Sequence, residues 1–410
     1  MKVLFFVHSF PCVSETFVLN QVTGMIDLGH DVKIYAWGES DSCVHEDYAR
    51  YSLESRIWRP CRKIPATRFT RIIKISPFFL GLLFKYGLRT FSLISGKFGC
   101  MARNLVMTYT AERIEKEKWK PDVIISHFGD IGLFITAMRE AGIISRRTRC
   151  YTFFHAHEIC RLNQKEITAN YGPMFNATDV LLPISNFWRN KLIKAGALPN
   201  KTAVFHMGIN PARFHFREPV KKTQEITILS VGRLVGQKGY EYALKGVASY
   251  IRQSSYKIKY IIIGKGDLEY SLKQLAIQYG ITENVEFRNA QSQDKVAATM
   301  TQADIFLLPS VTDNMGYMEG IPVALMEAMA MGLICISTRH SGIPELIENE
   351  VTGFLCEEKN SDDITNALLR IETSDISLLR QISHAAKTKV LEDFNIEKLL
   401  YNLDHLISDD

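Results

Sequence analysis

Short apolar segments alternate with helical stretches along most of this chain, and this alternation constrains its fold more than any other feature. The apolar segments are residues 2–8, 31–35, 121–127, 150–155 and 179–184 in the first half, and 226–231, 259–263, 285–287, 305–308 and 333–337 in the second. Strands that are apolar throughout are typical of parallel sheets covered by helices on both faces. The sequence therefore predicts an α/β protein with two doubly wound parallel sheets.

A stretch without the alternation lies between the two halves. Residues 206–225 carry charges, turn residues and two prolines, a composition typical of a linker. We expect a first lobe over 1–205, this linker, and a second lobe over 226–394. A final helix within 395–410 is expected to pack back on the first lobe.

Composition places the chain among ordinary globular proteins. Of its 410 residues, 46% are apolar and 23% are charged, which suffices to bury ordinary cores. The eight cysteines are scattered and form no Cys-x-x-Cys pair, which fits a reduced, cytoplasmic setting. The apolar start MKVLFFVHSF predicts a buried strand rather than a secretory signal, because His8 interrupts it and no small-residue cleavage site follows.

Positive charge is concentrated in one block. Residues 56–111 contain eleven Lys and Arg and no Asp or Glu, whereas the rest of the chain has 38 basic and 44 acidic residues. The block also holds the apolar run FFLGLLF at 78–84. Apolar residues between basic ones suit a helix in the interface of an anionic membrane, and the run is too short to span the bilayer. The alternative is a buried helix pair with a solvated basic face.

Two loops of the second lobe carry candidate ligand contacts. Arg233 and Lys238 follow the strand 226–231, and ligands of open α/β sheets bind beyond the carboxyl ends of strands. Both cations suit phosphate oxygens, although they could also be ordinary surface residues. Gly264 and Gly266 follow the next strand, but Glu269 stands where a dinucleotide fingerprint has its third glycine. Close packing explains these glycines equally well, and a nicotinamide-dependent oxidoreductase is disfavoured.

The segment EGIPVALMEAMA at 319–330 is the strongest motif. Pro322 suits the first turn of a helix, Gly320 allows close approach to a ligand, and the free N–H groups at the helix start attract anions. Glu319 and Glu327 can then lie on either side of a bound diphosphate. The alternative is an amphipathic helix with solubilising carboxylates, which is disfavoured for Glu327 because of its apolar neighbours.

Two motifs of the first lobe leave several interpretations open. His155 and His157, with Glu158 and Cys160 nearby, could form a metal site, although no second ligand cluster at zinc spacing appears. The histidines could also cap or pack, or face the other lobe. The other motif consists of Ser14, Glu15 and Thr16 at a predicted helix start. It fits a ligand contact and a simple N-cap equally well.

Together these motifs resemble the family 4 glycosyltransferases, which have the GT-B fold of two Rossmann-like lobes facing each other across a cleft. The matching segments are VGRL and QKG within 231–239, GKGDL at 264–268, LPS at 308–310, E-x7-E at 319–327, HSGIPELI at 340–347 and TGFL at 352–355. The segments at 319–330 and SETFV at 14–18 are similar to the branch that builds bacterial exopolysaccharides of the colanic-acid and amylovoran type.

The resemblance implies roles for individual residues. Arg233 and Lys238 would hold the donor diphosphate, Glu327 the ribose, Glu319 the donor sugar, and His155 the transferred sugar. The implied donor site as a whole comprises Arg233, Lys238, Gly264, Gly266, Arg288, Asn289, Glu319, Gly320, Ile321, Pro322, Val323 and Glu327, with Ser14, Glu15 and Thr16 on the acceptor side. The chain departs from the family in its first loop, PCVSET at 11–16, and at Asn289, where glycine is common.

The resemblance also implies an activity. A hexose would pass, with retention, from a UDP- or GDP-sugar to a saccharide or polyprenyl-diphosphate-linked acceptor at the inner face of the cytoplasmic membrane. No metal ion is expected, because two cations and a helix dipole can stabilise the leaving diphosphate. No cofactor and no nucleic-acid partner are expected either. No carboxylate is clearly placed as a nucleophile, which favours attack from the front face. A nucleotide-sugar epimerase of the same fold and a non-catalytic membrane-associated scaffold are the alternatives.

Overall fold

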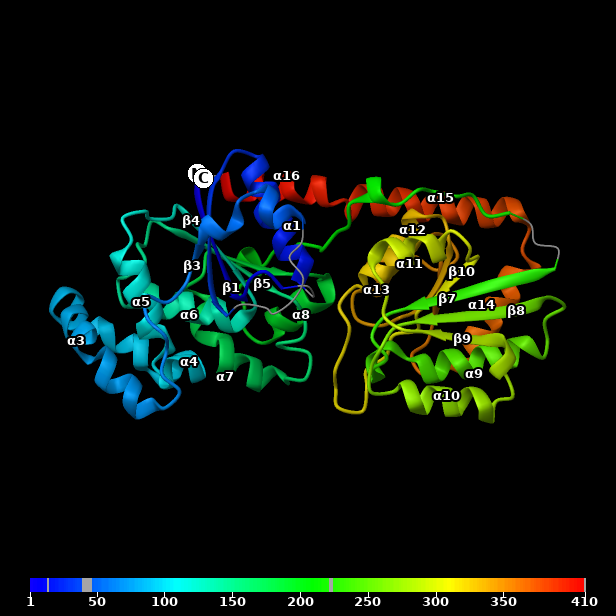
Figure 1. The fold of residues 1–410 in the computed structure, drawn as a ribbon, viewed down its shortest axis with the longest axis horizontal. Helices are drawn as coiled ribbons and strands as arrows, with labels where there is room; N and C mark the ends of the chain where they lie inside the picture. Colours follow the sequence, from blue (N-terminus) through cyan, green and yellow to red (C-terminus); the bar gives the residue numbers. More distant parts are fainter. Residues whose placement is uncertain (13–14, 39–45, 221–223, 409–410) are drawn as a thin grey trace. The chain divides into compact units, whose positions relative to one another are not determined.

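The computed structural model describes residues 1–12, 15–38, 46–220 and 224–408 (Figure 1). They form two compact units. The first unit holds residues 1–184, 188–205 and the end of the chain from 400, and the second unit holds 185–187 and 206–399. The chain therefore enters the second unit twice, briefly at 185–187 and then from 206, and returns to the first unit at its end.

A six-stranded parallel sheet forms the centre of the first unit, with the order β3-β2-β1-β4-β5-β6. Its strands are β1 (Lys2–Ser9), β2 (Asp31–Gly38), β3 (Ile57–Trp58), β4 (Val123–His127), β5 (Arg149–Phe154) and β6 (Val180–Pro183). Val3 of β1 pairs with Val32 on one side and Val123 on the other. The order reverses between β1 and β4, which is where open sheets of this kind bind ligands.

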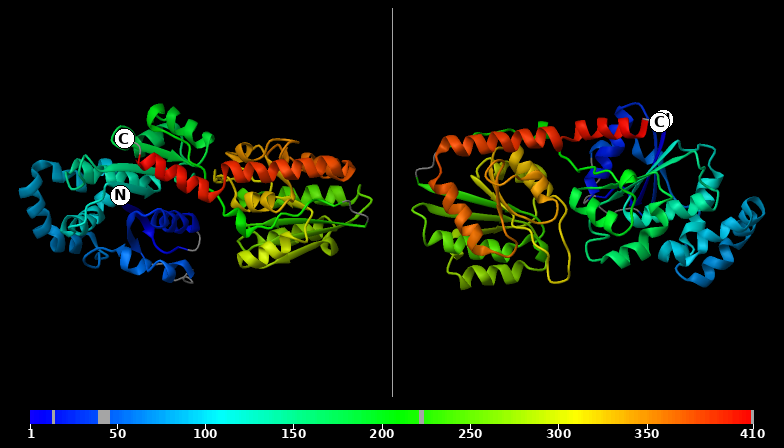
Figure 2. Two further views of the ribbon diagram at one scale, coloured as in Figure 1. Left: turned by 90° about the horizontal axis from the view of Figure 1, so that it is seen from above. Right: turned by 180° about the vertical axis from the view of Figure 1, so that it is seen from behind.

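Helices cover both faces of this sheet, as doubly wound sheets require (Figures 1 and 2). The main ones are α1 (Thr16–Asp27), α6 (Gly129–Glu140), α7 (Gln164–Phe175) and α8 (Asn186–Lys194). The end of α16 (Ile396–Ser408) packs on α1 so closely that a Cβ at Gly24 would lie 2.3 Å from Leu400 Cδ1. His30 also contacts Asp404 across 2.7 Å, which fixes the end of the chain on the first unit.

The short helix α2 (Glu46–Arg50) lies between β2 and β3. The basic block forms a group of helices between β3 and β4, namely α3 (Arg68–Tyr86), the 3-10 segments Gly87–Ile94 and Gly96–Phe98, α4 (Gly99–Arg103) and α5 (Val106–Lys116). Within the described residues, no single helix has the length and apolar character to cross a bilayer. The segments Arg68–Ile94 and Gly96–Arg103, which are bent by 56° relative to each other, together have the length and apolar composition of a membrane-crossing segment.

The second unit has its own six-stranded parallel sheet, with the order β12-β11-β10-β7-β8-β9. The strands are β7 (Glu225–Val231), β8 (Lys257–Ile263), β9 (Val285–Arg288), β10 (Ile305–Leu307), β11 (Ile334–Thr338) and β12 (Phe354–Cys356). The helices are α9 (Tyr240–Ile251), α10 (Glu269–Gln278), α11 (Gln293–Met300), α12 (Val323–Ala330), α13 (Ile343–Leu346), α14 (Ser361–Thr373) and α15 (Ile376–Asp393). Here the order reverses between β7 and β10.

The predicted fold class is confirmed, because both sheets are parallel and doubly wound. Each predicted strand is present with its ends shifted by at most two residues, except that β2 continues to Gly38, three residues beyond the predicted end. The sequence did not reveal β3 and β12, which have only two and three residues. The first helix begins at Thr16, not at Ser14, and Ser14 lies outside the described residues.

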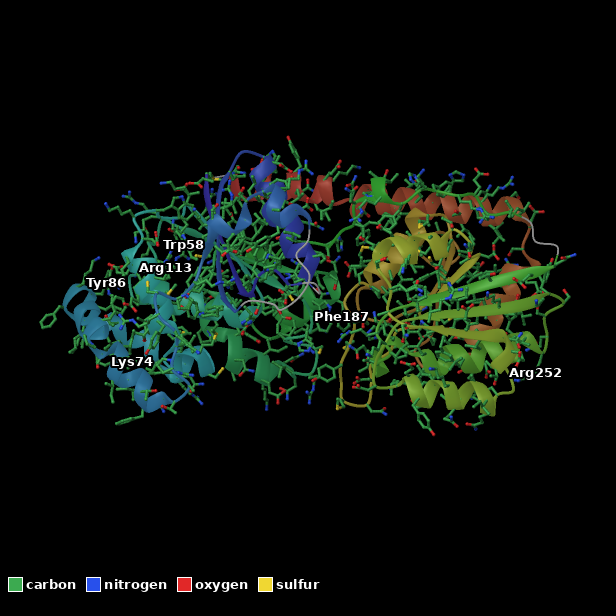
Figure 3. The ribbon with its side chains drawn as sticks, viewed as in Figure 1. Trp58, Lys74, Tyr86, Arg113, Phe187 and Arg252 are labelled. Atoms are coloured by element: carbon green, nitrogen blue, oxygen red, sulfur yellow. The ribbon has the colours of Figure 1, made fainter. Side chains whose placement is uncertain are left out.

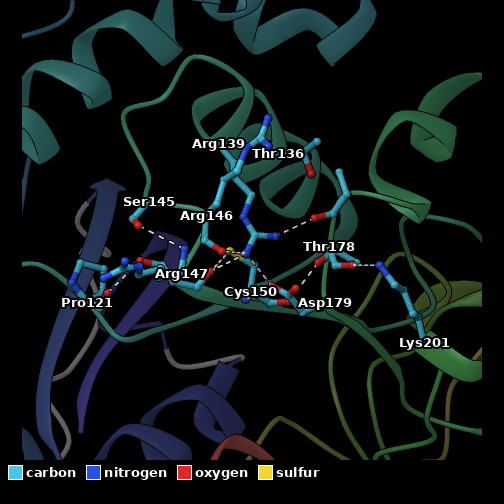
Figure 4. A network of polar contacts seen from close by, with 12 residues as sticks. Pro121, Thr136, Arg139, Ser145, Arg146, Arg147, Cys150, Thr178, Asp179 and Lys201 are labelled. Carbon is cyan, nitrogen blue, oxygen red and sulfur yellow. Dashed lines mark hydrogen bonds and ion pairs between the residues drawn. The ribbon is translucent and has the colours of Figure 1, made fainter. Parts of the chain in front are cut away.

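A polar network fastens the amino edge of the first sheet (Figure 4). Arg139 of α6 donates to Asp179 Oδ2 across 2.8 Å and to the carbonyls of Ala177, at 2.7 Å, and Thr148. Asp179 in turn accepts the N–H of Cys150 at 2.8 Å. One guanidinium group therefore joins α6 to the starts of β5 and β6.

Replacing Arg139 by leucine should lower the free energy of unfolding of the first unit by about 2 kcal/mol, because hydrogen bonds to charged groups contribute about 1.5–3 kcal/mol. All four tryptophans, Trp37, Trp58, Trp119 and Trp188, lie in this unit. Urea unfolding followed by tryptophan fluorescence therefore measures it. Arg146→Leu, which changes an exposed side chain beside the same network, is the control. Equal stability of the two variants would contradict this role.

Candidate functional site

The loop after β7 places Lys238 beside Glu319. The Nζ atom of Lys238 lies 3.2 Å from Glu319 Oε2, and the two side chains are only 12% and 15% exposed. Arg233, in the same loop, is exposed. Gly239 ends the loop with a φ of +67°, and a Cβ there would lie 1.9 Å from the carbonyl oxygen of Pro309. The loops after β7 and β10 thus meet at the carboxyl edge of the second sheet.

Gly264 and Gly266 allow the loop after β8 to pack against the loop after β7. A Cβ on Gly264 would lie 1.9 Å from the oxygen of Gly232, and one on Gly266 would lie 2.4 Å from that of Leu234. Backbone contact alone therefore requires both glycines, whether or not a ligand also touches them. The N–H of Gly264 donates to the carbonyl of Arg288 at 2.9 Å, so the end of β9 joins this loop.

Two backbone amides just before α12 have no hydrogen-bond partner among the described residues. Pro322 is the N-cap residue and Val323 the first helical residue. Among the described residues, no hydrogen bond reaches the N–H of Gly320 or Ile321. The N–H of Glu319 donates to His340 Nε2 at 3.0 Å. Unused amide N–H groups at the positive end of a helix can donate to an anion or to a hydroxyl oxygen.

Glu327 is buried within α12, with 8% of its surface exposed. Gln293 Nε2 donates to Glu327 Oε1 at 2.7 Å and supplies the polar partner that its apolar surroundings require. Burial raises the pKa of Glu327, although the hydrogen bond from Gln293 opposes this effect. The interpretation of Glu327 as a solubilising surface residue is therefore wrong.

Arg288 is the last residue of β9, and Asn289 follows it at the edge of the sheet. The guanidinium of Arg288 contacts both carboxylate oxygens of Glu286, at 2.7 and 3.0 Å. Asn289 and Ala290 are exposed. The Arg288 side chain is thus already paired, and a ligand would meet this segment chiefly through its backbone and Asn289.

Two histidines meet at the carboxyl edge of the first sheet. Nδ1 of His127, at the end of β4, lies 3.0 Å from Nε2 of His155, which follows β5. Phe17 of α1 lies against His155, with ring centroids 4.5 Å apart. Burial lowers the pKa of His155 to about 3, so the ring is neutral near pH 7. His155 therefore interacts as a neutral hydrogen-bonding ring and not as a cation.

Acidic side chains surround this pair. Glu158 Oε1 accepts the N–H groups of His155 at 3.0 Å and Gly129 at 3.4 Å, whereas its Oε2 is buried without a partner among the described residues. Burial raises the pKa of Glu158 to about 7 against the opposing effect of these hydrogen bonds. Nearby, His8 contacts Asp130 across 3.0 Å.

The residues predicted as metal ligands and acceptor contacts lie as follows. His157 is exposed and Cys160 is buried. No group of three or more His, Cys, Asp or Glu among the described residues could hold a metal ion. Glu15 occupies the N-cap position of α1 without a side-chain cap hydrogen bond, and its Oε2 is buried without a partner in the described part of the chain. Thr16 is exposed.

Sequence reasoning missed several residues of these two edges, namely His8, His127, Asp130, Gln293 and His340 as a contact of Glu319. His8, His127 and Asp130 could have been found, because they stand at or just beyond the ends of predicted strands. Gln293 gave no such signal, because its partner Glu327 is 34 positions away on another helix.

Two Rossmann-like units with these loops define the GT-B fold of glycosyltransferases. HepE of Anabaena, solved in complex with UDP, has this fold with a TM-score of 0.70 at 15% identity over 100% of both chains. Residues 212–389 match the family of glycosyl transferases group 1.

Two curated relatives match nearly the whole chain. The putative colanic acid biosynthesis glycosyltransferase WcaL of Salmonella typhimurium is 34% identical over 99% of both chains. The amylovoran biosynthesis glycosyltransferase AmsK of Erwinia amylovora is 35% identical over 96% of both chains. The chain therefore belongs to the glycosyl transferases group 1 and is a glycosyltransferase.

The raised pKa of Glu158 predicts a pH-dependent stability. The folded protein holds a proton that the unfolded chain releases above a pKa of 4.5, so the free energy of unfolding should fall between about pH 4.5 and 7. Glu158→Gln removes this dependence, and its stability relative to the natural protein should rise by up to about 3 kcal/mol across that range. Unfolding followed by tryptophan fluorescence at several pH values measures it. Parallel pH curves for the two proteins would contradict the assignment.

Proposed function

We propose that this glycosyltransferase transfers a hexose, with retention, from a UDP- or GDP-sugar to a lipid-linked saccharide during synthesis of a bacterial exopolysaccharide, capsule or O-antigen. The observation that carries the proposal is the meeting of Lys238, Glu319 and the start of α12 at the carboxyl edge of the second sheet. The names of WcaL and AmsK support the polymer class. Structures of HepE with UDP-glucose support the donor class.

The charges of the second unit suit a nucleoside diphosphate leaving group. Lys238 is largely buried and Arg233 is exposed in the same loop. Charge-assisted hydrogen bonds from both, together with the amides of Gly320 and Ile321, would stabilise the negative charge that develops on the diphosphate. Glu319 would accept hydrogen bonds from hydroxyls of the donor sugar, and Glu327 would accept them from hydroxyls of the ribose. We propose that these protein groups stabilise the diphosphate charge without a metal ion.

The proposed chemistry is a front-face substitution. The bond between the anomeric carbon and the phosphate oxygen breaks while the acceptor hydroxyl oxygen bonds to that carbon on the same face. The hydroxyl proton passes to the departing phosphate oxygen. His155 does not take this proton, because the burial that lowers its pKa to about 3 makes it a poor base near pH 7. It would instead orient the transferred sugar by a hydrogen bond.

The carboxyl edge of the first sheet would hold the saccharide part of the acceptor. Glu15 and Glu158 each present a buried carboxylate oxygen without a partner among the described residues, and Asp130 lies near Glu158. Buried polar atoms are costly unless a hydrogen bond satisfies them. Sugar hydroxyls can donate such bonds, and they can also accept one from the Glu158 carboxyl group while it is protonated. Thr16, and Ser14 outside the described residues, remain proposed acceptor contacts.

The helix α3 would attach the protein to the inner face of the cytoplasmic membrane. Its exposed apolar residues share one helical face: Phe69 (72% exposed), Ile72 (48%), Ile73 (57%), Leu80 (52%) and Phe84 (92%). The opposite face packs inward through Ile75 and Leu82. Exposed apolar faces of this kind mark interaction sites. A buried helix pair with a solvated basic face would leave this apolar face unexplained.

The cations of the basic block divide into two groups. Some are used inside the protein, because Arg62, Lys85 and Lys97 pair with carboxylates and three others, Arg56, Arg59 and Arg71, donate to backbone carbonyls. The others form no ion pair within the described residues and can meet anionic lipids; they are Lys63, Arg68, Lys74, Arg89 and Arg103. Lys74 lies on α3 (Figure 3).

Transfer tests the proposed function directly. The purified protein is incubated with UDP- and GDP-hexoses and a lipid-linked saccharide, and product mass and anomeric configuration are determined. We expect transfer with retention from at least one donor, undiminished by excess EDTA. An inverted product, or transfer that requires a restored divalent ion, would contradict the mechanism, and the absence of transfer from every donor would contradict the proposed donor class.

Arg233→Ala and Lys238→Ala should each reduce kcat/KM by about tenfold or more, since each loses a charge-assisted hydrogen bond worth about 1.5–3 kcal/mol. Lys238→Ala should have the larger effect, because it also leaves Glu319 without its 3.2 Å partner. The exposed Lys245 of the same unit provides the control variant Lys245→Ala. Unchanged donor affinity and turnover in both variants would remove these residues from the donor site.

Liposomes with anionic lipid should carry the protein upward in a flotation gradient at low salt, and binding should weaken at high salt. Phe69→Ser with Phe84→Ser should reduce binding through lost apolar contact. Arg68→Glu, Lys74→Glu and Arg89→Glu together should reduce it through lost charge. Tyr270→Ser with Ile277→Ser changes exposed apolar residues of α10 (76% and 59% exposed) and serves as the control. Protein that stays with the soluble fraction at low salt would disprove membrane attachment through α3.

A further inference from the structure

A fully buried histidine holds the segment that begins the donor-site helix. His340 is 0% exposed and follows β11. Its Nε2 accepts the backbone N–H of Glu319 at 3.0 Å, and its Nδ1 lies 2.6 Å from Glu358 Oε1. All three residues belong to the second unit. The imidazole therefore bridges a backbone amide on one side and a carboxylate on the other.

The two contacts fix the tautomer of this ring. An amide N–H can only donate, so Nε2 must be the unprotonated, accepting nitrogen. The proton of a neutral ring then lies on Nδ1 and is donated to Glu358. The hydrogen bonds from Thr312 and His340 hold the pKa of Glu358 below its ordinary value, although burial opposes them. A charged carboxylate favours the Nδ1–H tautomer.

The segment held by His340 has few other attachments. Across the described residues, no backbone–backbone hydrogen bond joins residues 318–321 to the rest of the chain. Within this segment, the carboxylate of Glu319 forms an ion pair with Lys238. Glu358 also accepts the N–H of Thr312 at 2.7 Å, which connects it to the loop after β10. His340 is thus the backbone hydrogen-bond anchor of a segment that is otherwise held by the Lys238–Glu319 ion pair and by the packing of Ile321 in the core.

We propose that His340 is a positioning residue that fixes the Glu319 carboxylate and the amides of Gly320 and Ile321 for the donor sugar. The inference rests on the proposed donor site. It assigns to the histidine no contact with the substrate, because the ring is fully buried and both its nitrogens are in use. Lys238 would set the direction of the Glu319 side chain, whereas His340 would set the position of its backbone.

Three variants separate the two hydrogen bonds of the ring. His340→Gln keeps an acceptor at about the place of Nε2, His340→Asn keeps a group at about the place of Nδ1, and His340→Leu keeps neither. Hydrogen–deuterium exchange of the peptide covering 317–323 is the first measurement. We expect exchange at least tenfold faster in the Asn and Leu variants and close to the natural rate in the Gln variant.

His206→Asn is the matched control for this measurement. His206 also forms a histidine–carboxylate contact in the second unit, 3.0 Å from Glu345, and it does not touch residues 318–321. Its loss should leave the exchange of that peptide unchanged. Glu358→Ala releases the other end of the bridge and should raise the exchange as His340→Asn does, which provides a second route if His340→Asn does not fold.

Transfer kinetics give the second measurement. His340→Asn should lower kcat/KM at least tenfold, and His340→Gln should stay within about threefold of the natural protein. In the background of Glu319→Ala, His340→Asn should cause a smaller loss than in the natural protein, because the carboxylate is gone and only the amides of Gly320 and Ile321 are left to position. Thermal midpoints of all variants are recorded, so that a loss of folding is separated from a loss of positioning.

Several results would overturn the inference. They are equal exchange in His340→Asn and the natural protein, equal losses of transfer in the Gln and Asn variants, or losses that multiply in the double variant. If the natural protein transfers no sugar from any donor, the proposed function fails, whereas the exchange data still decide whether His340 anchors the segment.

Discussion

Close backbone approach at the carboxyl edge of the second sheet is the constraint on which the candidate donor site depends. Three chain segments meet there, and two of the contacts leave no room for a side-chain carbon: at Gly239 against Pro309 and at Gly264 against Gly232. Because these contacts fix the loops after β7, β8 and β10 against one another, Lys238 can reach Glu319 from a different loop. The ion pair is a consequence of backbone packing and not its cause.

The two units have the same strand order, but the carboxyl edges of their sheets differ in electrostatic character. The edge of the second unit presents cations and unused amides, which suit a diphosphate. The edge of the first unit presents buried carboxylates, neutral histidines and aromatic rings. Parallel sheets place ligands at the same edge regardless of chemistry, so the loop residues alone decide which part of a reaction each unit serves.

Most of the fold could be predicted from the sequence, because a strand buried on both faces has an unmistakable apolar run. β3 and β12 were missed because they stand in apolar runs of only two and three residues, whereas the equally short β10 belongs to the longer run IFLL at 305–308. Arg233, Lys238, Glu319 and Glu327 could be proposed from local motifs. The partners Gln293 and His340 could not, because each acts on a residue brought near by the fold, and a buried histidine in a sequence resembles any core residue.

The first unit is discontinuous in sequence, and this has a consequence for recombination. Its body ends at residue 205, yet residues from 400 onward pack against α1, where Leu400 meets Gly24 and Asp404 meets His30. A chimaera that exchanges everything after 205 would give the first unit a foreign terminal helix facing Gly24. To exchange the second unit between relatives and keep the native packing of the first, a chimaera therefore needs two crossovers, one near 205 and one near 399.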